Sequence, residues 1–316
     1  FDRWPALIAE ITSDPCNCIP VIGPALPESL FGSLRDIAAR MAVRHDFALA
    51  PDGRQELAQV AQYLSYRQSG KFARAALANF LKSELLERQS ARVPDELRQM
   101  PVETLKLDRL ISALGERVRA ENADNLHSRL ARCPFPIYVT TGRDNLLRDA
   151  LRAEGKEPRS LIARWRRFDG IPPERFYGEP GFMPTVKQPV VLHMFGNLEF
   201  PETLVVSQDD YFDFLVGITQ RQANIDAPGL PHLLSSQLSS SGLLFLGFQV
   251  DDWDFRILYR TILGLEGMQS DESDITRVAV QIDPEEGASI EPHGARRYLE
   301  EFFRKTTETA IVWGSV

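Results

Sequence analysis

The sequence predicts an α/β fold with a mostly parallel sheet, helices on both of its faces, and an inserted helical module. Two observations support this. Short apolar runs of strand length alternate with stretches of helical periodicity along most of the chain, which is typical of parallel sheets. Between about residues 54 and 125, in contrast, every pattern is helical. Three helices without an intervening strand indicate a helical module beside the sheet.

The first part of the chain is expected to hold one strand and several helices. A short helix is predicted from Trp4 to Ile11, and the apolar run 19–22 reads as a strand that ends at Gly23. One helix is expected over about residues 29–44. Within the module, apolar residues at helical spacing predict three helices, around Leu57–Leu64, Phe72–Leu85 and Leu107–Val118.

Strands and helices alternate in the remainder of the chain. Ser207 is a candidate N-cap of an aromatic-rich helix, and other helices are predicted at 144–153, from Asp251 onward and near 295–303. The segments 170–184 and 226–231 read as loops on the face where strands end. Strands are expected at 136–140, 161–165, 190–194, 204–206, 243–246, 276–282 and 309–313.

Bulk composition argues against several classes of function. The net charge of −8 gives no global field that would favour nucleic acid, and no apolar run approaches the roughly 20 residues of a membrane-spanning helix. Three cysteines and five scattered histidines show no ligand-like spacing, so no metal site is predicted. We expect reduced cysteines in a cytoplasmic protein. The start at Phe1 and the end just after a strand suggest a piece of a longer chain.

The stretch from 240 to 258 is the most informative. Leu243–Leu246 is an apolar run that stops at Gly247, and Asp251 and Asp252 then open a helix. A buried strand that ends in glycine and leads into a helix presents backbone N–H groups where a nucleotide can approach closely. The alternative for the two acids is a structural one, because acidic residues are favoured in the first turn of a helix.

Four strand-to-loop units follow one another in an order used by a known family. They are IPVIGPALPESLFGSLRDIAARMA, YVTTGRDNLL, VVLHMFGNLEFPETLVVSQDDYFDFL and LLFLGFQVDDWDFRIL. Together they resemble the sirtuin-like domains of bacterial anti-phage defence proteins, over about residues 19–313. The usual forms there are Gly-Ala-Gly-x-Ser, Thr-Thr-Asn-Tyr-Asp-x-Leu-Leu, Leu-His-Gly-Ser before Thr-x-x-Asp-Tyr, and Gly-Tyr-Ser-x-x-Asp.

The resemblance implies a Rossmann-like fold that binds NAD and often hydrolyses it to nicotinamide and ADP-ribose. It also implies a homo-oligomer under the control of a sensor domain or partner protein. Gly196 and Gly247 end strands, where glycine has few reasons other than close approach of a ligand. The positions implied to contact NAD or a related nucleotide are Gly23, Pro24, Ala25, Leu26, Thr141, Gly142, Phe195, Gly196, Gly247, Phe248 and Asp252.

The departures from the family pattern fall on the chemistry. Gly142 stands where the family has an asparagine, and Phe195 stands where it has the catalytic histidine, directly before the turn glycine. In the phosphate loop, Ala25 adds a Cβ where backbone should approach a pyrophosphate, while Pro24 and Pro27 each lack an N–H donor. This loop should hold a dinucleotide less well than the usual form.

Cleavage of the nicotinamide–ribose bond needs a group that stabilises positive charge on the ribose and a base that activates a water or hydroxyl. His193, Asp144 and Asn145 are the remaining polar candidates. His193 lies two residues before Phe195, so both side chains point to the same face of an extended strand. An equal alternative is a core histidine bonded to a backbone carbonyl. For Asn145, an N-capping or exposed role is the favoured alternative.

Two functions from different classes remain. The first is an NAD hydrolase of anti-phage defence, placed first because hydrolysis is the usual activity of the family. The second is a catalytically inactive module that binds a nucleotide or a protein partner and relays a signal, which the changes at Ala25, Gly142 and Phe195 favour. Both rest on one expectation, that Gly23, Thr141, Gly196 and Gly247 gather around a single crevice at the carboxyl edge of the sheet.

Overall fold

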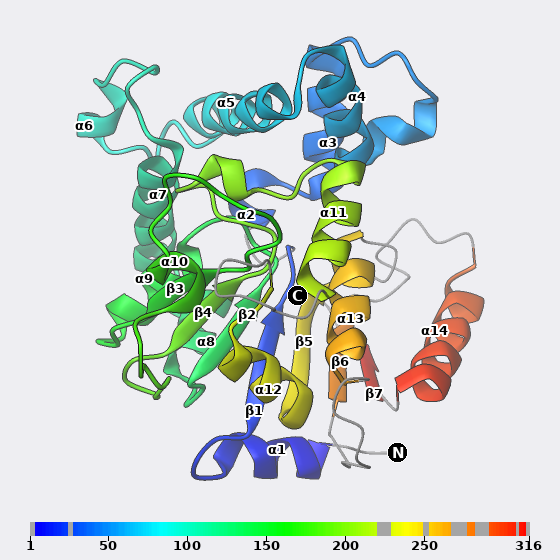
Figure 1. The fold of residues 1–316 in the computed structure, drawn as a ribbon. Coiled ribbons are helices and arrows are strands. Elements are labelled where there is room, and N and C mark those ends of the chain that lie inside the picture. Colours follow the sequence, from blue (N-terminus) through cyan, green and yellow to red (C-terminus); the bar gives the residue numbers. More distant parts are fainter. Residues whose placement is uncertain are drawn as a thin grey trace.

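A computed structural model of the chain describes residues 4–24, 28–219, 229–248, 253–266, 277–281, 291–307 and 310–313. Its centre is a seven-stranded sheet in the order β3-β4-β2-β1-β5-β6-β7, in which every pair of neighbours is parallel (Figure 1). The predicted Rossmann-like α/β fold is therefore confirmed. The strands are β1 (Cys18–Ile22), β2 (Ile137–Thr140), β3 (Arg159–Ile162), β4 (Val190–His193), β5 (Gly242–Phe248), β6 (Arg277–Gln281) and β7 (Ala310–Trp313).

The strand order places a switch point between β1 and β5. From β1 the chain continues to β2 on one side, whereas from β5 it continues to β6 on the other. In open parallel sheets, ligands bind in the crevice outside the carboxyl ends of two such strands. The ends of β1 and β5, which carry Gly23 and Gly247, therefore define where a ligand site is expected.

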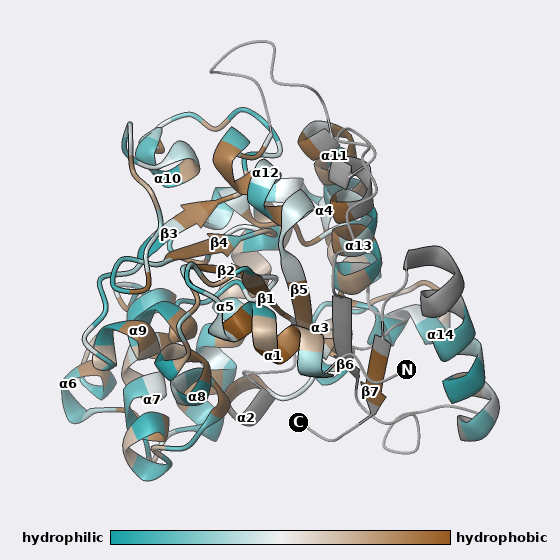
Figure 2. Ribbon diagram, turned by 90° about the horizontal axis from the view of Figure 1, so that it is seen from below, coloured by the Kyte–Doolittle hydropathy of each residue, from teal (hydrophilic) through white to brown (hydrophobic). Residues whose placement is uncertain are grey.

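Both faces of the sheet are covered, as its near-continuous apolar strands require. On β1, Ile19 and Val21 face α11 (Gln208–Thr219), α12 (His232–Ser240) and α13 (Trp253–Glu266). Cys18 and Ile22 face the opposite layer, formed by α1 (Trp4–Thr12), α8 (Leu126–Arg132) and α9 (Leu146–Ala153). Figure 2 shows the hydrophobic strands enclosed by helices with hydrophilic outer faces, α14 (Pro292–Thr307) among them.

The helical module lies over the carboxyl ends of the strands (Figure 1). Its core is separate from those on the two faces of the sheet, and Leu198, Leu204 and Val206 from the loop after β4 also pack into it. The three predicted helices correspond to α4, α5 and α7. Its elements are α2 (Glu28–Phe31), α3 (Leu34–Arg44), η1 (Pro51–Gln55), α4 (Leu57–Arg67), α5 (Gly70–Arg88), α6 (Asp95–Arg98) and α7 (Leu107–Glu121).

Polar contacts connect the module to the first turn of α11. Ser207 is the N-cap of α11, as predicted, because its Oγ accepts the N–H of Asp210 at 3.2 Å. Asp210 forms a buried ion pair with Arg74 of α5. Asp209 accepts from Gln62 Nε2 of α4 at 2.7 Å and returns its own N–H to Gln62 Oε1 at 2.9 Å.

Several sequence-based boundaries were wrong. The helix expected over 29–44 is split into α2 and α3 at Gly32, which has a φ of 78° and is followed by the N-cap Ser33. Residues 204–206 are buried but form no strand. They follow the 3₁₀ helix η2 (Pro201–Thr203), and Val205 N–H bonds only to Phe195 O, at 3.1 Å. The strand expected at 161–165 is β3, which begins earlier, at Arg159, and ends at Ile162. The helices α8, α10 (Glu174–Tyr177) and α12 were not predicted.

Candidate functional site

Gly23 and Gly247 meet at the switch point. Gly23 N–H donates to Leu246 O at 2.7 Å, and a Cβ on Gly23 would lie 2.2 Å from Gly247 O. Gly247 has a φ of 71° at the shift of register between Leu246 and Phe248. The close contact therefore requires glycine at position 23, and the left-handed φ favours glycine at position 247. Their contact with NAD stays a prediction.

Thr141 and Gly196 lie at the same edge. Thr141 N–H donates to Ile22 O at 2.9 Å, which joins the end of β2 to the end of β1. Gly196 follows β4 with a φ of 83°, and a Cβ there would lie 2.3 Å from Thr203 O. Gly196, Thr141 and Gly23 thus follow β4, β2 and β1, and Gly247 lies near the end of β5. These four strands are neighbours in the sheet, and all four residues are buried.

A small cavity of about 60 Å³ opens beside this edge, between it and the helical module. Among the proposed site residues, Pro24, Gly142 and Asp144 line it, together with apolar side chains of the module. Pockets for drug-sized ligands usually exceed roughly 300 Å³. This cavity by itself therefore has room for only a fragment of a dinucleotide. Ala25, Leu26 and Asp252 lie outside the described part of the chain.

His193 is enclosed at this edge and only 1% exposed. Its Nδ1 lies 3.2 Å from Gly142 O, and its Nε2 lies 3.2 Å from Asn197 Nδ2. A carbonyl must accept and an amide nitrogen must donate, so this network assigns a neutral ring with the proton on Nδ1. Burial lowers the pKa of His193 to about 4, against a small raising effect of the Gly142 carbonyl. This geometry matches the core-histidine alternative.

Asn145 pairs with Asn197 instead of capping a helix. Asn197 Nδ2 donates to Asn145 Oδ1 at 2.9 Å, and Asn145 Nδ2 donates to Asn197 Oδ1 at 3.4 Å. Asn145 is buried and makes no side-chain cap to α9, so the capping or exposed alternative was wrong. The physical reason is that Asp144 Oδ1 accepts the N–H of Leu146 at 2.9 Å and takes over the helix start.

Asp144 lies at the edge of the cavity and has a raised pKa. Burial raises its pKa to about 6, although the N–H groups of Leu146 and of Asp144 itself favour the charged form. The side chain is partly exposed and lines the cavity next to Gly142. A carboxyl with a pKa near neutrality can exchange a proton at physiological pH. Of the three proposed catalytic residues, Asp144 is the one that reaches the cavity.

Phe195 is fully buried and does not face the cavity. Its ring centroid lies 5.3 Å from Tyr211 and 5.0 Å from Phe214, and the guanidinium of Arg143 lies 5.9 Å above it. Phe248 is equally buried and packs against Phe245 and Phe255. Both rings therefore belong to the core in this structure, and their contact with a nucleotide stays a prediction.

A buried polar network covers Phe195. Arg143 forms an ion pair with Asp254 at 3.3 Å and donates to Val205 O at 2.9 Å and Tyr211 Oη at 2.8 Å. The Tyr211 hydroxyl donates in turn to Asp254. Burial and the Asp254 carboxylate raise the pKa of Tyr211 well above its ordinary value, so the hydroxyl stays protonated.

Sequence reasoning missed Arg143, Asn197 and Asp254. Arg143 had one available signal, because it lies between Gly142 and Asp144 in a segment already chosen as functional. Asn197 directly follows the turn glycine Gly196. Asp254 could be interpreted as an ordinary acid in the first turn of a helix, and its partners come from distant parts of the chain.

Within the described ranges no group of three or more His, Cys, Asp or Glu side chains could hold a metal ion. Over the same ranges, none of the helices has both the length and the apolar character needed to cross a membrane.

Comparison with known protein families identifies one family that this chain matches. A family model described as "SIR2-like domain" matches residues 136–304, which include β2 to β6 and more than half of the chain. The match leaves out β1, the whole helical module and β7. No curated protein matches the chain. SIR2-like domains bind NAD, and the carboxyl ends of β2, β4 and β5 lie within the matched region. This chain belongs to the SIR2-like domain family.

Proposed function

We propose that this chain is a SIR2-like module that binds an NAD-related nucleotide at the carboxyl edge of its sheet and does not hydrolyse it. The observation that carries the proposal is the environment of His193. Both of its ring nitrogens are engaged by Gly142 and Asn197, and its low pKa keeps the ring neutral. A base must have a free lone pair near its substrate, and His193 has none available.

The position of Phe195 supports the same conclusion. The family has a histidine there, whereas this chain has a phenylalanine enclosed by Tyr211, Phe214 and Arg143. The fit to NAD is partial. Asp144 supplies a carboxylate that suits ribose hydroxyl groups, but the cavity of about 60 Å³ accepts only a fragment of a dinucleotide.

One observation favours a second candidate, NAD hydrolysis. The pKa of Asp144 is raised to about 6 at the edge of the cavity, so its carboxylate could take a proton from a water molecule near neutral pH. A role in anti-phage defence, a homo-oligomeric state, control by a sensor domain and a cytoplasmic location stay predictions.

The test is a calorimetric titration of the chain with NAD and with ADP-ribose, followed by chromatographic measurement of released nicotinamide. Asp144→Asn keeps an oxygen that can accept the Leu146 N–H, and Asp36→Asn on the exposed face of α3 is the control. Binding without release supports the first proposal. Release that Asp144→Asn abolishes and Asp36→Asn preserves selects hydrolysis. If neither nucleotide binds, both proposals fail.

A further inference from the structure

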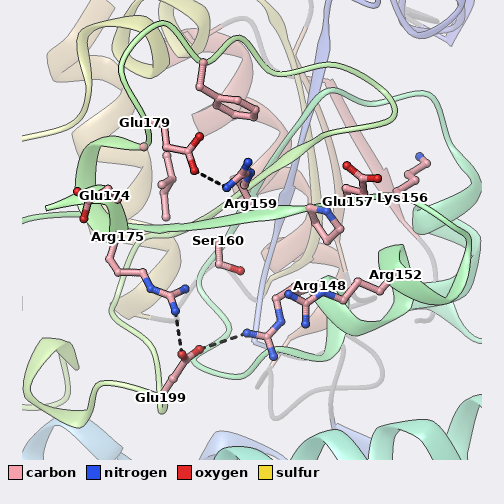
Figure 3. Close-up of a pocket in the computed structure, with 14 residues that line it drawn as sticks. Arg148, Arg152, Lys156, Glu157, Arg159, Ser160, Glu174, Arg175, Glu179 and Glu199 are labelled. Carbon is pink, nitrogen blue, oxygen red and sulfur yellow. Dashed lines mark hydrogen bonds and ion pairs between the residues drawn. The ribbon is translucent and has the colours of Figure 1, made fainter. Parts of the chain in front are cut away.

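A large cavity lies at the β3 edge of the sheet. It has a volume of about 680 Å³ and is lined by the consecutive residues 156–161 (Figure 3). Arg148 and Arg152 of α9 form one wall. Arg175 of α10 and the following segment with Glu179 and Phe182 form another. We call this cavity the edge groove, because it follows the first half of an edge strand.

Among the described residues, the backbone of β3 forms sheet hydrogen bonds on only one of its two sides. The N–H groups of Glu157, Arg159 and Ala163 donate to the carbonyls of Lys187, Pro189 and His193 at 2.8, 2.8 and 2.9 Å. In a parallel ladder, alternate residues direct their N–H and C=O groups to opposite sides. Those of Ser160 therefore face outward, and no described residue bonds to either group. Pro158 also faces outward, where its missing N–H costs no ladder bond.

The hydroxyl group of Ser160 also lacks a hydrogen-bond partner among the described residues. Its Oγ is buried. Figure 3 shows the hydroxyl directed into the groove, toward the side on which Arg148, Arg175 and Glu199 lie. Buried polar atoms in folded proteins are normally paired. Ser160 thus presents three unused hydrogen-bonding groups to one space: its amide, its carbonyl and its hydroxyl.

Most charges that line the groove neutralise one another. Glu199 bridges Arg148 and Arg175 at 3.2 Å each, and Arg159 pairs with Glu179 at 2.7 Å. Arg152, Lys156, Glu157 and Glu174 form no ion pair within the described ranges, although Lys156 Nζ donates to Cys133 O and Glu157 Oε2 accepts from Gln188. Arg152, Lys156 and Glu157 lie toward the start of β3 and Glu174 toward its end (Figure 3). The start of the groove therefore has one positive charge in excess, and its end has a free negative charge.

We propose that the edge groove binds an extended peptide segment of a partner protein, which adds to β3 as a further strand. Its backbone bonds to the outward amide and carbonyl of Ser160, as in other strand-addition complexes. Its acidic side chain lies near Arg152 and its basic side chain near Glu174.

The test uses two blocked, fluorescently labelled peptides and the 316-residue chain. Glu-Thr-Val-Thr-Val-Thr-Lys satisfies both free charges in a parallel orientation, and Lys-Thr-Val-Thr-Val-Thr-Glu satisfies them in an antiparallel one. We expect one of the two to bind with a Kd of about 1 mM or tighter by fluorescence anisotropy. Hydrogen exchange of the segment 157–163 should slow at the same time.

Backbone methylation is the matched control. N-methyl groups on one alternate set of peptide residues should abolish binding, and the same groups on the other set should preserve it, because only one side of an added strand faces β3. The double variant Arg152→Glu with Glu174→Arg should exchange the preference between the peptides; both residues are exposed, so the fold is not at risk.

Several results would overturn the proposal. These are no binding by either peptide, binding that survives both methylation patterns, and a preference that ignores the double variant. Displacement of the bound peptide by NAD or ADP-ribose would assign the groove to a nucleotide instead.

Discussion

The side chains of Asn145 and Asn197 exchange two hydrogen bonds at the carboxyl edge of the sheet, at 2.9 and 3.4 Å. Asn197 also donates to His193 Nε2 at 3.2 Å and accepts the Glu199 N–H at 2.8 Å. Every hydrogen-bonding site of the Asn197 amide is thereby used. This one residue positions the Asn145 amide and requires an unprotonated Nε2 on His193.

Asn197→Leu should be strongly destabilising. The change leaves His193 Nε2, the Asn145 amide and the Glu199 N–H without partners, and we expect a loss of about 3 kcal/mol in the free energy of unfolding. Asn79→Ala on the exposed face of α5 is the control and should change it by less than about 0.5 kcal/mol. Urea denaturation measures both, and equal values for the two variants would contradict the role of Asn197.

Gly23→Ala should disrupt the switch point. The added Cβ would lie 2.2 Å from Gly247 O, so one of the two strand ends must move, at a cost of about 3 kcal/mol. Gly155→Ala has no atom within 4 Å and a φ of 75°, so only backbone strain of about 1 kcal/mol is expected. Thermal unfolding compares them. A Gly23→Ala protein as stable as Gly155→Ala would show that the two strand ends separate easily.

The pH dependence of stability should distinguish the contribution of His193 from that of Asp144. The pKa of His193 falls to about 4 on folding, so its contribution is complete above its ordinary value of 6.5 and is lost as the pH falls toward 4. The pKa of Asp144 rises to about 6, so the folded state takes up its proton first and gains stability as the pH falls from 6 toward 3.8. The two effects oppose each other in the native protein.

Asp144→Asn removes one of these effects. Between pH 6 and pH 4, the variant should lose about 1 kcal/mol more stability than the native chain, a figure reduced because Asp144 is partly exposed. Urea denaturation at the two pH values measures the difference, and Asp36→Asn is the control. Parallel curves for Asp144→Asn and the native chain would contradict the raised pKa.

Phe195→His restores the family residue but should not restore hydrolysis. The imidazole would lie beneath Arg143 among Tyr211 and Phe214, without access to the cavity. We expect a stability loss of about 3 kcal/mol from lost packing and no release of nicotinamide. Phe195→Leu separates the loss of aromatic packing from the added polarity. Nicotinamide release by Phe195→His would mean that the site opens in solution.

The sequence predicted the sheet better than the site. Strand-length apolar runs such as Leu243–Leu246 are buried on both faces, so composition alone reveals them. The polar network was not predictable, because Arg143 meets Asp254 across 111 positions and Asn145 meets Asn197 across 52. No local periodicity encodes such pairs. Gly23 and Gly196 are required by the protein's own backbone, so their presence does not by itself indicate a ligand.

Three consecutive residues in the first turn of α11 connect to three different parts of the molecule. Asp209 contacts α4, Asp210 contacts α5, and Tyr211 contacts Asp254 of α13. The first turn of α11 therefore joins the helical module to the polar network over Phe195, so a substitution that displaced this turn would break contacts in both at once.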